Sequence, residues 1–305
     1  ITLVYGILRF SHFAHGDVMA FGTMAVIIFT WWLQALGVSI DPLPTALLAL
    51  PVGIAVTAVL LLGTDRVVYR FYRRVRAAPI VVVMASLGVM FVINGLVRFI
   101  IGPDDQNFAD GARFLFTVRE FREATGLEEG LGLRWSQLIT IIVTLAVMAG
   151  LFWFLNRTRT GKSMRAFSDN EDLALLSGIN PERVVAVTWF IVAVLVTVAG
   201  TLYGLDKSFK AFTYFQLLLP MFAAAILGGM GNPLGAVAGA YVIALSEVGV
   251  TYAFRKFFQY LLPENMEPSG LMQLLSTDYK FAVSFVLLVL VLLFRPTGLF
   301  KGQSL

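Results

Sequence analysis

The sequence predicts an all-α, polytopic bundle of transmembrane helices. Of its 305 residues, 58% are hydrophobic and only 14% are charged, and the mean hydropathy is +0.81. Uncharged stretches recur at about the 20 residues that a helix needs to cross the hydrocarbon core, and they are longer than the strands of a membrane β-barrel. A water-soluble globule could not cover such runs with polar side chains. We therefore expect a multi-pass membrane protein whose spans are helices.

Apolar runs between charged residues predict about eight spans, after a truncated N-terminal helix that ends near residue 8. The expected spans are 17–37, 43–63, 78–101, 135–155, 184–205, 214–230, 234–254 and 278–294. The chain begins at Ile1 inside an apolar stretch, without Met or a basic leader, so we expect part of the first helix to be missing. Because no internal repeat is evident, residues 1–305 are expected to form a single transmembrane domain.

The charged residues predict which loops share a side of the membrane. The short loop from Asp65 to Arg76 carries five arginines, which is typical of a cytoplasmic loop. Alternation along the chain then places the loop 156–183 in the cytoplasm. It places the loop 102–134, with seven acidic residues against four arginines, outside. The net charge of +4 therefore reflects loops at the membrane surface, and no nucleic-acid partner is expected.

The residue types argue against an enzyme. The absence of cysteine excludes disulfides, thiolate metal sites and a cysteine nucleophile. His12 and His15 are three residues apart and could share a metal, but no third ligand is evident, so a structural role is preferred and no metal is expected. The segment from Gly161 to Ser163 imitates the end of a phosphate-binding loop but lacks its first glycine, so we expect no nucleotide and no cofactor on this chain.

The loop 156–183 is expected to contain a short helix joined closely to the span that follows. Ser168 and Glu171 are spaced as a capping box, and Gly178 stands where a left-handed C-terminal cap belongs. Asn180 and Pro181 are a favoured start for the next helix. The apolar side of the short helix must pack on the chain's own helix ends or on a docked subunit, and from the residues alone the first alternative is preferred.

A glycine-rich segment interrupts the apolar run of residues 222–241. Gly228, Gly229, Gly231, Asn232 and Pro233 require a break or a turn in the helix. The break could be a discontinuous helix on a substrate pathway, or a tight turn between two helices. The Gly235 and Gly239 spacing that follows predicts close helix packing.

Polar side chains within the spans are the remaining candidates for a substrate pathway. Glu247 is a lone carboxylate that could bind an ammonium group or could simply hydrogen-bond a neighbouring helix. Ser86, Asn94 and Arg98 leave the same two alternatives open. The candidate pathway residues are His15, Ser86, Asn94, Gly228, Gly229, Asn232 and Glu247.

Several motifs together resemble the branched-chain amino acid ABC transporter permeases along essentially the whole chain. The motifs occur in the order Leu3-Val4-Tyr5-Gly6, Phe13-Ala14-His15-Gly16-Asp17, Thr160-Gly161 with Arg165-Ala166, Gly178-Ile179, and the run from Ile226 through Gly228-Gly229-Met230-Gly231-Asn232-Pro233 to Gly235. The segment from Phe13 to Asp17 is similar to the H-type subunit rather than to its M-type partner.

The resemblance implies a subunit of an importer in the bacterial inner membrane. Its partners would be an M-type permease in a heterodimer, two ABC subunits that hydrolyse ATP, and a periplasmic binding protein that delivers leucine, isoleucine or valine. Besides membrane lipid, this chain would contact the ATPase through the short helix, and it would catalyse no chemistry itself. The residues implied in this coupling are Thr160, Gly161, Arg165, Ala174, Gly178 and Ile179.

Three alternatives to this function remain. Related permeases carry urea or short amides, and the motifs indicate architecture more than cargo. A secondary transporter would need intramembrane carboxylates, of which Glu247 is the clear candidate. A channel would show a ring of polar or charged residues and would need no cytoplasmic docking helix.

Overall fold

The structure is a computed structural model, and it describes residues 1–40, 43–108, 114–126, 132–252, 274–276, 279–295 and 297–300. These residues form helices, apart from loops and one short antiparallel ladder. The predicted all-α bundle is therefore confirmed. The chain divides into two compact units, Ile7–Phe215 and Ile1–Gly6 with Gln216–Leu305, and each unit is described by itself. That the whole chain is a single domain stays a prediction.

The helices and strands follow the expected apolar runs closely. The N-terminal part of the chain forms α1 (Thr2–Leu8), α2 (His15–Ala35), α3 (Ala46–Thr64), η1 (Asp65–Tyr69), α4 (Arg70–Arg74), α5 (Pro79–Ile101), β1 (Phe114–Phe116), α6 (Val118–Thr125), β2 (Leu133–Arg134) and α7 (Trp135–Arg157). The rest forms α8 (Arg159–Asp169), α9 (Glu171–Leu176), α10 (Pro181–Lys207), α11 (Ala211–Gln216), α12 (Leu218–Gly228), α13 (Pro233–Thr251) and α15 (Lys280–Phe294).

Seven helical stretches within the described residues are long and apolar enough to cross a membrane. They correspond to the first seven spans that the sequence predicts. The eighth predicted span appears as α15, an apolar helix of 15 residues, and residue 278 of that prediction lies outside the described residues. The span predicted for 214–230 begins earlier, at Ala211, and Leu217 separates α11 from α12.

Small residues set the close packing at the centre of the larger unit, where α2 contacts α3, α5 and α10. A Cβ atom on Gly22 would lie 2.6 Å from Thr197 Oγ1, and one on Gly53 would lie 2.3 Å from Val26 Cγ2. The buried Thr197 hydroxyl donates a hydrogen bond to Thr57 Oγ1 at 3.0 Å. Close approach through small residues, joined by a hydroxyl hydrogen bond, is a common way for helices to associate in lipid.

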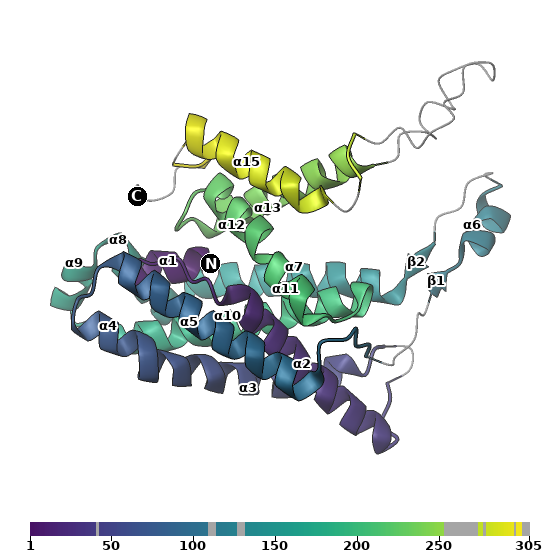
Figure 1. Ribbon diagram of the computed structural model, residues 1–305, viewed down its shortest axis with the longest axis horizontal. Helices are drawn as coiled ribbons and strands as arrows, with labels where there is room; N and C mark the ends of the chain where they lie inside the picture. Colours follow the sequence, from purple (N-terminus) through teal and green to yellow (C-terminus); the bar gives the residue numbers. More distant parts are fainter. Residues whose placement is uncertain are drawn as a thin grey trace. The chain divides into compact units, whose positions relative to one another are not determined.

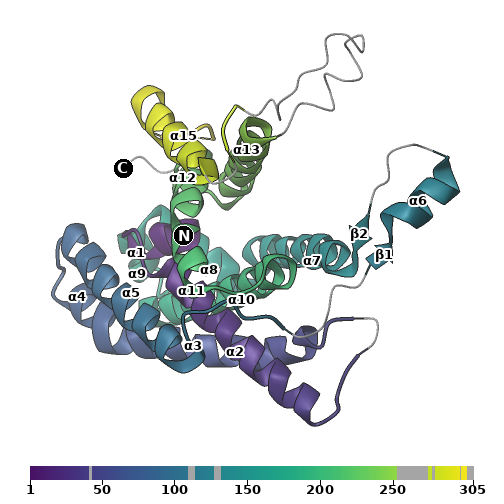
Figure 2. The same cartoon turned by 45° about the vertical axis from the view of Figure 1, so that its right-hand side comes forward.

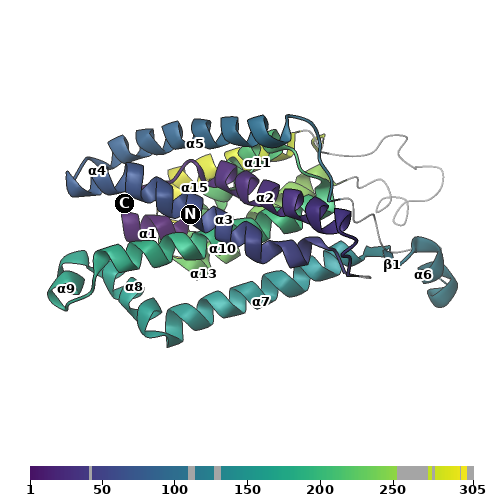
Figure 3. The ribbon, with the colours of Figure 1, turned by 90° about the horizontal axis from the view of Figure 1, so that it is seen from below.

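The predicted cytoplasmic and outer segments lie at opposite ends of the larger unit. The short helices α4, α8 and α9 lie at one end, and β1 and α6 lie at the opposite end (Figure 3). The two arginine-rich segments therefore share a side. One expectation is wrong, because the segment from Asp65 to Arg76 is not a plain loop: α3 continues through the π-helical turn η1 into α4.

The loop 102–134 contains a small structured element in its described part. Strands β1 and β2 pair antiparallel at the start of α7, with Phe114 opposite Arg134. The α6 helix lies beyond the two strands, away from α7 (Figure 2). Thr117 caps α6 and exchanges hydrogen bonds with Glu120 in a capping box. These hydrogen bonds from the Thr117 backbone and side chain lower the pKa of the Glu120 carboxyl.

In the smaller unit, α12 and α13 form a helical hairpin that packs against α15 (Figure 1). Its buried core consists of Ala223, Ala224, Leu227 and Ile243, and residues of α15 pack against it. The alanines let the helices approach closely, as the small residues do in the larger unit.

Candidate functional site

The α8 helix is anchored to the end of α7 by one glycine and one threonine. Thr158 caps α8, because its hydroxyl accepts a hydrogen bond from the backbone N–H of Gly161 at 3.0 Å. A Cβ atom on Gly161 would lie 2.2 Å from the backbone oxygen of Phe154 and 2.6 Å from Leu155 Cα. Backbone cannot move aside as a flexible side chain can, so this position requires glycine. Thr160 next to it is half-buried, and Arg165 on the same helix is exposed.

The predicted capping box at the start of α9 is wrong. The α8 helix continues through Ser168 to Asp169, and the residue that caps α9 is Asn170, whose side chain accepts a hydrogen bond from the backbone N–H of Leu173 at 3.0 Å. Asn170 has an extended backbone, as helix caps commonly do, and it separates the two helices. The sequence placed the start of the short helix two residues too early.

The end of α9 and its connection to α10 are as predicted. Gly178 has a left-handed φ of +79°, its N–H donates to the oxygen of Leu175, and the N–H of Ile179 donates to the oxygen of Ala174. These two hydrogen bonds define a Schellman motif. Asn180 then caps α10, with Pro181 at the first helical position. The connection between α9 and α10 thus consists of Gly178 and two further residues of defined conformation.

The α9 helix has one buried residue and an apolar outer surface. Ala174 is buried, whereas Leu173 and Leu176 are 60% and 85% exposed. Nothing lies within 4 Å of the position that a Cβ atom of Gly178 would take. Exposed leucines on a polar segment outside the spans are typical of interaction surfaces. Of the two alternatives that the sequence left open, the exposure of these leucines favours a docked subunit.

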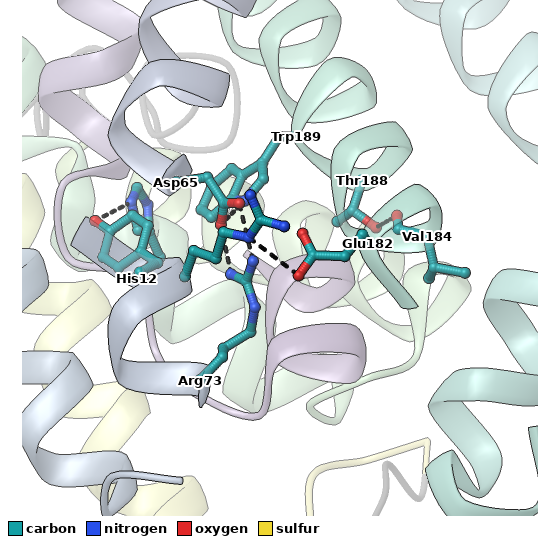
Figure 4. Close-up of polar contacts among 9 residues, drawn as sticks. His12, Asp65, Arg73, Glu182, Val184, Thr188 and Trp189 are labelled. Atoms are coloured by element: carbon teal, nitrogen blue, oxygen red, sulfur yellow. Dashed lines mark hydrogen bonds and ion pairs between the residues drawn. The ribbon is translucent and has the colours of Figure 1, made fainter. Parts of the chain in front are cut away.

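A network of charged and aromatic side chains holds the first turns of α10 against η1 and α4 (Figure 4). Trp189 Nε1 donates to Asp65 Oδ1 at 2.8 Å, and the Arg73 guanidinium donates to both oxygens of Asp65 at 2.5 and 2.9 Å. Nearer the start of α10, Glu182 forms an ion pair with Arg70 at 3.2 Å. A bidentate arginine–carboxylate pair has a defined geometry, so this network fixes α10 relative to α4.

The π-helical turn explains how Asp65 and Tyr69 both reach the interior. Both are buried, although the turn lies in an arginine-rich segment. A π-helical turn widens the helix locally, and such turns occur often at functional sites. The Tyr69 ring stacks on Trp189 at 5.6 Å between ring centroids. Nothing in the sequence pattern signals this turn.

The two histidines belong to the same buried cluster. His12 Nε2 lies 2.9 Å from the Tyr69 hydroxyl, and His15 Nδ1 lies 3.4 Å from His12 Nδ1. Burial lowers the pKa of the His12 imidazole to about 3, so the ring is neutral at physiological pH. Among the described residues, no group of three or more His, Cys, Asp or Glu side chains could hold a metal ion. The contacts of these histidines are those of a structural cluster.

The polar residues of α5 contact the beginning of α2. Ser86 Oγ accepts a hydrogen bond from the backbone N–H of Phe13 at 3.2 Å, and Asn94 Nδ2 donates to Asp17 Oδ1 at 2.6 Å. Asp17 is completely buried, and its second oxygen has no hydrogen-bond partner among the described residues. Ser86 and Asn94 are predicted from the sequence as candidates and Asp17 is not, although a carboxylate in an apolar helix is itself a signal of function.

The glycine-rich segment forms a tight turn between α12 and α13. Gly229 and Gly231 have φ values of +96° and +85°, and Asn232 caps α13 by accepting a hydrogen bond from the N–H of Gly235 at 3.1 Å. A Cβ atom on Gly228 would lie 2.1 Å from the oxygen of Gly235. One on Gly239 would lie 2.3 Å from the oxygen of Ala224, which confirms close packing there. The geometry favours the tight turn over a break on a substrate pathway.

Glu247 contacts a neighbouring helix. Ser284 of α15 is buried and donates a hydrogen bond to Glu247 Oε1. Of the two alternatives for this carboxylate, the structure shows the hydrogen bond between helices. Of the candidate pathway residues, His15, Ser86 and Asn94 lie in the larger unit, and Gly228, Gly229, Asn232 and Glu247 lie in the smaller one.

These features define a multi-pass helical membrane protein with a short helix presented outside its spans. Residues 1–292 match the family model described as the permease component of branched-chain amino acid transport systems, and the chain belongs to this family. No solved structure matches the chain.

Curated relatives are named as permeases of the same kind of system. The chain is 29% identical over 299 residues to the high-affinity branched-chain amino acid transport permease BraD of Pseudomonas aeruginosa, and 29% identical over 300 residues to LivH of Escherichia coli. Both alignments cover 98% of this chain and 88% of the relative. A probable LivH of Methanocaldococcus jannaschii is 24% identical over 305 residues.

Proposed function

We propose that this chain is the membrane subunit of an ATP-driven importer for branched-chain amino acids in a bacterial inner membrane. It would form the translocation pathway together with an M-type permease. Separate ABC subunits would bind and hydrolyse ATP, and a periplasmic binding protein would deliver the amino acid. The family membership and the relatives' names support the cargo.

The observation that carries the proposal is the exposed apolar helix α9 at the start of the span α10. Leu173 and Leu176 offer the ATPase an apolar surface, and the Schellman motif at Gly178 joins that surface to α10. When the ATPase subunits close on ATP, they would displace α9. The network around Asp65 and Trp189 would then pass the displacement to α3, because a packed network moves between discrete arrangements rather than deforming continuously.

The coupling residues have separate roles in this mechanism. Gly161, with the cap residue Thr158, holds α8 on the end of α7. Thr160 is half-buried in the first turn of α8, and Arg165 is an exposed positive charge on the same helix. Ala174 packs inward, and Gly178 with Ile179 forms the rigid connection. The chain itself would perform no catalysis and carry no cofactor.

Gly178→Val tests this proposal in proteoliposomes that contain the complete importer. Valine is strained at φ +79° but meets no neighbouring atom, so we expect the protein to insert and purify normally. Because the Schellman connection would be disturbed, ATP-driven leucine uptake should fall by about tenfold or more. The matched control is Gly178→Asn, since asparagine tolerates the left-handed conformation and should retain most of the uptake. Normal uptake by Gly178→Val would refute the coupling role.

Uptake by the same proteoliposomes tests whether the transported substrate is a branched-chain amino acid or a small amide. Labelled leucine, isoleucine and valine should be transported with the binding protein and ATP present, and an excess of urea or acetamide should not compete. Transport of urea but not of leucine would contradict the proposed cargo and leave the coupling mechanism intact.

A further inference from the structure

A pocket of about 480 Å³ lies beside α9 in the larger unit. Its lining comes from the end of α1 and the segment after it, from α4, the start of α5 and the connection between them, from α8 and α9, and from the start of α10. Pockets of roughly 300–1,000 Å³ are typical of small-molecule sites. The exposed leucines that we assign to ATPase docking, Leu173 and Leu176, do not line it. The pocket is therefore separate from the proposed docking surface.

One part of the lining is positively charged. Arg74 ends α4 and Arg76 follows it in the connection to α5; both are exposed and form no ion pair with another described residue. Arg73 also lines the pocket, but its guanidinium is engaged by Asp65. Two arginines not engaged by carboxylates of the described chain provide a site for an anionic group such as a carboxylate.

A second part of the lining, from a different element, is negatively charged. Glu171 and Asp172 stand in the first turn of α9, are exposed, and also form no ion pair with a described residue. Glu182 lines the pocket too, but it is paired with Arg70. The pocket thus offers acidic groups on α9 and basic groups at the end of α4 and in the connection that follows it. A ligand that carries both charges would satisfy both.

A third part of the lining is apolar. Phe10, Phe167 and Val185 are each less than a tenth exposed, and the exposed Leu175 of α9 adds to them. An aliphatic side chain placed here would be removed from water, and this burial would favour binding by about 25 cal/mol per Å² of apolar area. The pocket therefore combines three kinds of surface, namely basic, acidic and apolar.

Backbone strain occurs at this pocket as well. Three described residues other than glycine have positive φ, and two of them, Arg9 at +56° and Arg76 at +49°, line the pocket. Arg9 is held there by a hydrogen bond from its guanidinium to the backbone oxygen of Ser168 at 2.5 Å. Strained backbone of this kind collects at ligand sites because the surrounding fold maintains it.

We propose that this pocket binds a free zwitterionic amino acid with an aliphatic side chain, and that its occupancy inhibits transport from the product side. The carboxylate would lie on Arg74 and Arg76, the ammonium group on Glu171 and Asp172, and the side chain against Phe10 and Phe167. Because α9 supplies one wall, a ligand that bridges α9 to the α4–α5 connection stabilises one position of the helix and opposes its displacement by the ATPase. The identity of the ligand as the imported product rests on the proposed function.

Binding is measured first, because it does not depend on transport. Purified importer is placed in nanodiscs of phosphatidylglycerol and titrated with radiolabelled leucine, with the wild type compared to Arg74→Gln/Arg76→Gln. The matched control is Arg157→Gln/Arg159→Gln, which removes two exposed arginines that do not line the pocket. We expect the Arg74/Arg76 variant alone to lose affinity by about fivefold or more. Equal leucine affinity in all three proteins would overturn the site.

Two analogues and one lipid test the chemistry of the ligand. 4-Methylpentanoate lacks the ammonium group and 3-methylbutylamine lacks the carboxylate, so neither should displace labelled leucine as leucine itself does. Phosphatidylethanolamine also carries both charges and apolar chains. If nanodiscs that contain it abolish leucine binding to the pocket, the site belongs to a lipid headgroup and the proposal is wrong.

The regulatory consequence is measured in proteoliposomes loaded with ATP, with or without unlabelled leucine in the lumen, and supplied outside with binding protein and labelled leucine. Luminal leucine should lower the initial uptake rate of the wild type by about fivefold or more. The Arg74→Gln/Arg76→Gln variant should match the wild type without luminal leucine and should resist inhibition. Equal inhibition of both proteins would refute the regulatory role. Absence of any uptake by the wild type would instead contradict the proposed function. The leucine titration in nanodiscs would still show whether the pocket binds leucine.

Discussion

The connections α9–α10 and α12–α13 share one local design but differ in what surrounds them. Each begins with a glycine of positive φ, at Gly178 and Gly229, and each ends in an asparagine cap and a proline at the first helical position. Gly228 and Gly235, on either side of the α12–α13 turn, lie directly against each other's backbone, whereas nothing lies within 4 Å of a Cβ on Gly178. The same sequence of turn residues thus joins two tightly packed helices at α12–α13 and joins a helix with an exposed surface to a span at α9–α10.

This contrast shows that local sequence sets the turn and that neighbouring elements set its role. The α12–α13 hairpin has its partner in α15 within the same unit. The α9 helix leaves three leucines exposed, Leu173, Leu175 and Leu176, as the proposed docking of a subunit requires. Substitutions should therefore damage stability in the first region and transport in the second.

The largest stability effect is expected from Gly239→Ala in α13. Its new methyl group would lie 2.3 Å from the backbone oxygen of Ala224, so the two helices must separate, at a cost of about 3 kcal/mol. Thermal unfolding of the detergent-solubilised protein measures this loss. Gly249→Ala is the matched control on the same helix, because nothing lies near its Cβ and alanine favours the helix. Equal melting temperatures of the two variants would contradict the tight hairpin.

A smaller effect is expected from Asp65→Asn in the network at α10. This change removes the charge that pairs with Arg73 and weakens the hydrogen bond from Trp189, at a cost of about 2 kcal/mol after allowing for the partial exposure of the arginine. Glu182→Gln nearby breaks an ion pair that is much more exposed, and it should cost about 0.5 kcal/mol or less. If both variants lose the same stability in chemical denaturation, the network does not hold α10.

The smallest effect is expected from Glu247→Gln. The amide oxygen still accepts the hydrogen bond from Ser284, so stability should change by less than about 1 kcal/mol and leucine uptake by less than about twofold. Ser284→Ala is the companion variant, because it removes the donor instead of the acceptor. A large loss of uptake by Glu247→Gln with unchanged stability would return this residue to the substrate pathway.

The sequence predicted the spans well, because a helix in lipid needs a long apolar run and charges interrupt such runs. It predicted the caps at Gly178, Asn180 and Pro181 for a similar reason, since these residues act through their own backbone conformation. It read the arginines after Asp65 as a loop, whereas α3 continues as helix beyond its apolar part. The Ser168 capping box is wrong because α8 continues through Ser168 to Asp169, and Asn170, which caps a helix as well as serine does, comes directly after it.

The contacts of the site could be predicted only in part. The sequence flagged His12 and His15, but their neighbours Tyr69 and Trp189 lie far away along the chain, and a π-helical turn that brings Tyr69 inward has no sequence signature. Asp17 was missed for the same reason, since its burial against Asn94 depends on how α2 packs on α5. Such pairings are properties of packing rather than of local pattern.

The most direct test of the docking role of α9 is co-purification of the ATPase with variants of its exposed leucines. The wild type, Leu173→Gln/Leu176→Gln, and the control Val118→Gln, which alters an exposed residue of α6, are purified in mild detergent and their partners quantified by mass spectrometry. We predict that an ABC ATPase accompanies the wild type and the control but falls by about tenfold or more with the double variant. Full recovery of the ATPase with the double variant would contradict docking through α9.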